Sequence, residues 1–160
     1  MANYYDQSSF IVEFDTPENR EAASAAIQPL LDVLNRDWDD DDYQDEYDWP
    51  GTLGGLAPCG APDISVEGRH FWFQSDESID AWTTGNIVML LLKQDGAPKD
   101  VYFTWASMCD KSRVNGFGGG CCYVTAVGVE IAHTDTMRDY MKARAASESS
   151  VMLPLANGQF

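Results

Sequence analysis

The sequence VYFTWA, at residues 101–106, alternates Val, Phe and Trp with Tyr, Thr and Ala, and this period of two predicts a β-strand. The sequence CCYVTAVGVEIAH follows at residues 121–133 and predicts a further strand, with Gly128 as a point of interruption. Because neighbouring strand residues point to opposite faces, one of Cys121 and Cys122 is expected in the core.

Strands are also predicted nearer the N-terminus. Residues 10–14, FIVEF, form a short run rich in β-branched and aromatic side chains, which is typical of a strand. Residues 64–76, ISVEGRHFWFQSD, contain two β-rich pieces on either side of a glycine. These pieces form either a hairpin or one long strand with a bulge at Gly68.

Helices are predicted between these strands. The first has Thr16 as its N-cap and Pro17 at its first position, and it kinks or restarts at Pro29. The second is predicted to be capped by Ser78 and to extend to about residue 94, with Trp82 among its inner positions.

A last helix is predicted to begin at Thr134 or Asp135. The order is then strand, helix, one or two strands, helix, strand, strand and helix. This order predicts an α+β domain with a mostly antiparallel sheet and two or three helices packed on one face. A split βαβ arrangement fits the first six elements.

The length of 160 residues suits one domain. We expect that domain to span residues 1–146, with an acidic aromatic insert at 37–49 and a Gly/Pro-rich connector at 50–62. Residues 147–160 are expected to form an irregular tail.

Charge is distributed very unevenly along the chain. The net charge is −16, and residues 1–50 hold fourteen Asp and Glu against two Arg. Eight of the twelve residues at 37–48, DWDDDDYQDEYD, are acidic. Direct binding of nucleic acid through this part is disfavoured, because phosphates require Lys and Arg. A partner with a cationic surface fits instead.

Aromatic side chains lie inside the acidic stretch and can anchor it to a partner by stacking on arginine. The predicted partner-binding residues are Asp37, Trp38, Asp39, Asp40, Asp41, Asp42, Tyr43, Asp45, Glu46, Tyr47 and Asp48. The alternative is a solvated loop whose aromatics pack locally. A Ca²⁺ loop is disfavoured, because the stretch has no central glycine and no closing glutamate in register.

A second candidate site is the glycine-rich stretch DKSRVNGFGGG at residues 110–120. Two bases beside closely spaced glycines can hold a phosphate or carboxylate through backbone N–H groups. The predicted anion-binding residues are Lys111, Arg113, Gly116, Gly118, Gly119 and Gly120. The alternatives are a plain connection between two strands, or a contact between the two bases and the acidic stretch.

The sequence predicts no catalytic residues, no metal site and no cofactor. The four cysteines show no CxxC spacing, and His70 and His133 are isolated, so a zinc site is not supported. No apolar stretch is long enough for a membrane span, and residues 1–10 lack the basic and apolar regions of a signal peptide. We therefore expect a cytoplasmic protein with reduced cysteines and no membrane partner.

Several motifs of the C-terminal half occur together: QSDE at 74–77, FTWASMCDKSR at 103–113 and GFGGGCCYVTA at 116–126. Over roughly residues 70–135 the chain resembles a group of small proteins from phages and mobile genetic elements. The resemblance implies a phage or mobile-element context and carries over no activity.

In that context the acidic stretch predicts a non-enzymatic binding protein that acts on a host protein. Carboxylates spaced along a surface can imitate phosphates, so a cationic, nucleic-acid-binding surface of the host protein is the expected target. Such a protein would be a DNA mimic or an anti-defence inhibitor in the host cytoplasm. The alternatives are a small-ligand protein or enzyme using residues 111–120, and a phage accessory or structural protein whose acidity serves solubility.

Overall fold

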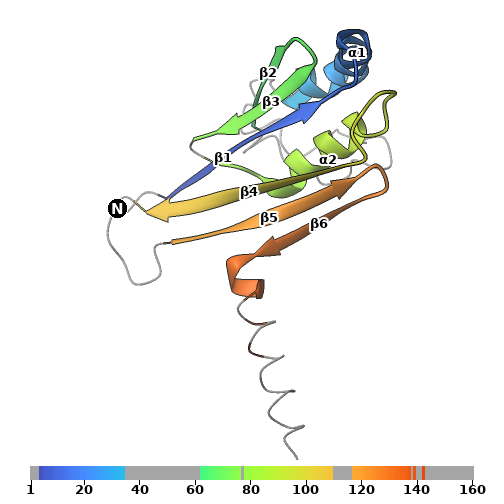
Figure 1. Ribbon diagram of the computed structural model, residues 1–160. Helices are drawn as coiled ribbons and strands as arrows, with labels where there is room; N and C mark the ends of the chain where they lie inside the picture. The colour runs from blue at the N-terminus through green and yellow to red at the C-terminus, as the bar shows by residue number, and fades with distance from the viewer. Residues whose placement is uncertain are drawn as a thin grey trace, which may run out of the picture.

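The computed structural model describes residues 4–34, 62–76, 78–109, 117–137, 139 and 142 (Figure 1). Helical backbone is present at residues 134–137, where the sequence predicts the start of a last helix. Along the chain the elements are β1 (Tyr4–Glu13), α1 (Pro17–Leu34), β2 (Asp63–Glu67), β3 (His70–Ser75), α2 (Ala81–Leu91), β4 (Asp100–Cys109), β5 (Phe117–Thr125) and β6 (Gly128–His133).

The six strands form one sheet in the order β2-β3-β1-β4-β5-β6, and every neighbouring pair is antiparallel. β1 and β2 are therefore parallel to each other, with β3 between them. β3 and β4 are likewise parallel, with β1 between them. Each of these two pairs is connected through a helix, so the first six elements form the ferredoxin-like β-α-β-β-α-β motif. The predicted α+β class is confirmed, and the β5–β6 hairpin extends the sheet beyond β4.

A two-residue turn joins β2 to β3, since Glu67 pairs with His70 in the antiparallel ladder. Gly68 has a φ of 56° in this turn, a conformation that side chains with a Cβ rarely adopt. The sequence allowed a hairpin or a bulged strand, and the structure has the hairpin.

The start of α1 agrees with the sequence. The Thr16 hydroxyl accepts a hydrogen bond of 3.2 Å from the backbone N–H of Asn19, and Pro17 is the first helical residue. The helix continues through Pro29, so the predicted restart there is wrong, while the alternative, a kink, stays a prediction.

The start of α2 differs from the prediction. Asp80, not Ser78, is the N-cap, and its carboxylate accepts hydrogen bonds from the N–H groups of Trp82 and Thr83 at 2.9 and 3.2 Å. The carbonyl of Ser78 instead accepts a hydrogen bond from the hydroxyl of Ser75 at the end of β3. The helix ends at Leu91, earlier than predicted.

This cap predicts a measurable difference between two neighbouring substitutions. Asp80→Ala is expected to lower the free energy of unfolding by about 1 kcal/mol, because two helix N–H groups lose their acceptor. Ser78→Ala keeps every backbone group and is expected to change that energy by less than about 0.5 kcal/mol. Urea denaturation of both variants measures the difference, and equal effects would contradict the assignment of the cap.

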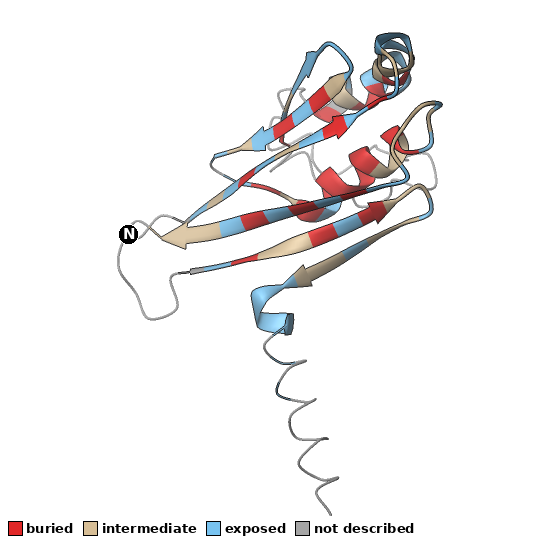
Figure 2. Ribbon diagram, in the orientation of Figure 1, coloured by how far each residue is buried: buried red, intermediate tan, exposed pale blue. Residues whose placement is uncertain are grey.

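The core lies between the helices and the face of the sheet that they cover (Figures 1 and 2). Phe71 and Phe73 of β3 are fully buried there, as is Val12 of β1. The ring of Phe10 stacks between Phe73 and Phe103, with centroid distances of 4.8 and 4.3 Å, and so joins three strands. No helix among the described residues is long and apolar enough to cross a membrane.

A glycine sets how closely α2 approaches the sheet. A Cβ added to Gly85 would lie 2.6 Å from Cγ1 of Val129 in β6 and 3.2 Å from Sγ of Cys122 in β5. Real carbon atoms do not approach this closely, so only glycine allows α2 to lie against β5 and β6 at this distance.

Candidate partner-binding face

The helices α1 and α2 contact each other and pack on the same face of the sheet. The opposite face, here called the outer face, is covered by neither helix (Figure 1). Along β4 the burial pattern alternates strictly from Val101 to Ala106, with Val101, Phe103 and Trp105 buried and the intervening residues exposed (Figure 2). In each strand, every second residue points into the core, and the residues between them form the outer face.

Large apolar side chains lie on this outer face where polar ones are the norm for a water-facing sheet. The side chains of Ile11, Trp72, Tyr102 and Tyr123 are 55, 45, 61 and 42% exposed, respectively. They form two directly opposed cross-strand pairs, Ile11 with Trp72 and Tyr102 with Tyr123. We call these four residues the outer apolar row. Two exposed apolar cross-strand pairs on one face indicate a candidate interaction surface.

Two carboxylates, those of Asp100 in β4 and Glu130 in β6, lie beside the Tyr102–Tyr123 pair. The charge of Asp100, together with burial, hydrogen bonding to Asp100 and the charge of Glu130, raises the pKa of the Tyr123 hydroxyl. Negative neighbours raise a phenol pKa because they disfavour the phenolate. Asp100, two residues before Tyr102, and Glu130, the register partner of Tyr123, therefore place negative charge on this part of the outer face.

A polar hollow of about 490 Å³ opens on the sheet beside Trp72, whose indole N–H donates a 2.8 Å hydrogen bond to the Ser9 hydroxyl. Every lining residue carries a hydroxyl, amide or carboxylate group, and such groups can bind polar or cationic side chains. It is lined by Gln7, Ser8, Ser9, Asp63, Gln74, Ser75 and Asp76.

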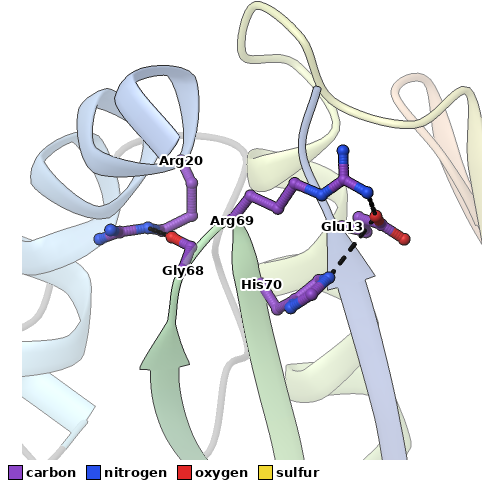
Figure 3. A network of polar contacts seen from close by, with 5 residues as sticks. All are labelled: Glu13, Arg20, Gly68, Arg69 and His70. Carbon is purple, nitrogen blue, oxygen red and sulfur yellow. Dashed lines mark hydrogen bonds and ion pairs between the residues drawn. The ribbon is translucent and has the colours of Figure 1, made fainter. Parts of the chain in front are cut away.

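The basic residues near the β2–β3 turn are held by groups of the same chain (Figure 3). Arg69 forms an ion pair with Glu13, and Nε2 of His70 lies 3.5 Å from the same carboxylate. Arg20 of α1 donates a 2.9 Å hydrogen bond to the carbonyl of Gly68. These contacts connect the hairpin to β1 and α1, although exposed ion pairs contribute little stability.

The adjacent cysteines lie on opposite faces, and Cys122 is the buried one, which confirms that one of the two is in the core. Burial, followed by the charge of Cys121, raises the pKa of Cys122 to about 12. Because the thiolate is the reactive form, Cys122 is expected to react with iodoacetamide at pH 8 about a thousandfold more slowly than a free cysteine. Mass spectrometry of the labelled native protein measures this, and rapid labelling of Cys122 would contradict its placement.

The predicted sites fall mostly outside the described residues. All eleven predicted partner-binding residues of the acidic stretch lie outside them, as do Lys111, Arg113 and Gly116. Gly118, Gly119 and Gly120 lie in β5 and pair with Ser107, Ala106 and Trp105 of β4. A Cβ at Gly119 or Gly120 would collide with Trp105, so close strand packing accounts for these two glycines.

The outer apolar row was not predicted from the sequence. The alternation in VYFTWA indicated that the side chains of Tyr102 and Phe103 point to opposite faces of the sheet. It did not show which of the two faces the helices leave uncovered. Among the described residues, no group of three or more His, Cys, Asp or Glu could hold a metal ion. No family model, curated protein or solved structure matches the chain.

Proposed function

We propose that this protein is a non-enzymatic binding protein that occupies a cationic, nucleic-acid-binding surface of another protein. In the phage or mobile-element context that the sequence implies, it acts as a DNA mimic or anti-defence inhibitor in the host cytoplasm. The observation that supports this most directly is an outer face on which exposed aromatic side chains stand beside carboxylates.

The outer face and the acidic stretch have separate roles in the proposal. The carboxylates supply the charge that a cationic groove normally meets on phosphates, and the acidic stretch at residues 37–48 adds eight more. The outer apolar row supplies contact area, since exposed charge alone gives fast but weak association. A net charge of −16 also opposes direct contact with DNA or RNA.

Salt dependence provides the test. Full-length protein is immobilised and host lysate is applied at about 50 and 200 mM salt, and the captured partner's affinity is then measured at both concentrations. The partner affinity is expected to fall at least tenfold over this range, because screening weakens a contact carried by many charges. An affinity that stays constant would contradict mimicry.

A further inference from the structure

The Tyr102–Tyr123 pair differs from the rest of the outer apolar row because acidic residues adjoin it. Asp100 lies two residues before Tyr102 on β4, and therefore on the same face. Glu130 of β6 is the register partner of Tyr123. The charges of both carboxylates influence the hydroxyl of Tyr123, so two aromatic rings and two carboxylates gather on three neighbouring strands.

We propose that Tyr102, Tyr123, Asp100 and Glu130 form a subsite for an arginine side chain of the partner protein. This inference rests on the proposed function and names the chemistry that the outer face recognises. Exposed tyrosine rings offer their faces to a cation, and adjacent carboxylates accept hydrogen bonds from it.

The chemistry of this subsite favours arginine over lysine. A guanidinium group is planar and weakly hydrated, so it can stack on a ring while it donates hydrogen bonds to a carboxylate. A lysine ammonium is a compact, strongly hydrated charge and uses only part of such a site. Arginine is also the side chain that most often contacts nucleic-acid phosphates bidentately, which agrees with a partner whose surface normally holds phosphates.

A second copy of this chain fits the subsite poorly. Two chains that each carry a net charge of −16 repel each other. Charge complementarity therefore favours a basic partner.

Two peptides of equal charge, octa-arginine and octa-lysine, test the subsite with the full chain at low salt. Octa-arginine is expected to bind at least fivefold more tightly. Tyr102→Thr/Tyr123→Thr keeps strand-forming residues but removes both rings, and should bring the two affinities within twofold of each other. Tyr102→Phe/Tyr123→Phe should keep the preference, as should Trp82→Ala, which removes an exposed aromatic from α2.

A charge-matched comparison covers the case in which the threonine variant fails to fold. The control variant, Glu21→Gln/Asp95→Asn, removes two exposed charges away from the subsite. The subsite variant, Asp100→Asn/Glu130→Gln, is expected to weaken octa-arginine binding at least threefold more than this control. Equal binding of both peptides, or an arginine preference that survives the threonine substitutions, would overturn the subsite but leave the proposed function standing. If neither peptide binds, both the arginine subsite and the proposed function are wrong.

Discussion

Phe73→Ala is expected to lower the free energy of unfolding by about 3–5 kcal/mol, whereas the neighbouring Trp72→Ala is expected to lower it by about 1 kcal/mol. Phe73 is fully buried and stacks on Phe10, so truncation leaves a cavity in the core. Trp72 is 45% exposed, and its truncation removes a cross-strand pair with Ile11, another with Ser65 and a hydrogen bond to Ser9. Urea denaturation with unchanged slopes measures both energies.

The comparison of these two adjacent residues tests which face of the sheet is covered. Trp72→Ala should also weaken binding to the captured partner, since Trp72 belongs to the outer apolar row. Similar losses of stability in the two variants would show that both faces are covered, and the proposed binding face would then be wrong.

Neutralising Asp39, Asp40, Asp41 and Asp42 as asparagine is expected to weaken partner binding tenfold or more. The four substitutions keep side-chain size and remove four charges, and a loss of about 1.4 kcal/mol of attraction already corresponds to a factor of ten. The free energy of unfolding is expected to change by about 1 kcal/mol or less, because removal of like charges relieves repulsion. Isothermal titration calorimetry and urea denaturation of the same preparation give both quantities.

Two results would count against the role of the acidic stretch. Loss of the fold in the asparagine variant would mean that these aspartates stabilise the domain. A folded variant with unchanged partner affinity would mean that the stretch is a solvated loop and that the outer face alone binds.

The fold class could be predicted because its signals are local. Alternation in VYFTWA, the Thr16–Pro17 helix start and the glycine in the β2–β3 turn each restrict the backbone within a few residues. The order of the elements then indicated the split βαβ arrangement, since few topologies satisfy it.

The helix α2 shows why other features could not be predicted. Trp82 was expected to face the core but is exposed, while the small residues Thr83, Thr84 and Gly85 are buried. The large residues Ile87, Val88 and Leu91 are buried in the core as well, and Gly85 permits the close approach of the helix to β5 and β6. Hydrophobic periodicity gives weight to large apolar residues, so it assigned Trp82 to the core and passed over the buried threonines and glycine.

The candidate site was also hidden from the sequence. Tyr102 and Tyr123 are adjacent only because β4 and β5 pair in one register, and they are exposed only because both helices pack on the other face. Neither fact is encoded near these residues. The acidic stretch, in contrast, was evident from composition alone.

If the proposed function is right, this protein and nucleic acid compete for one surface of the partner, and a competition titration measures that competition. A labelled DNA duplex is bound to the partner captured from host lysate, and fluorescence anisotropy is followed as the full-length protein is added at about 50 mM salt. Complete displacement of the duplex is expected, and the apparent affinity of this protein for the partner should weaken as the duplex concentration is raised. A stable ternary complex of partner, duplex and this protein would contradict the proposed function.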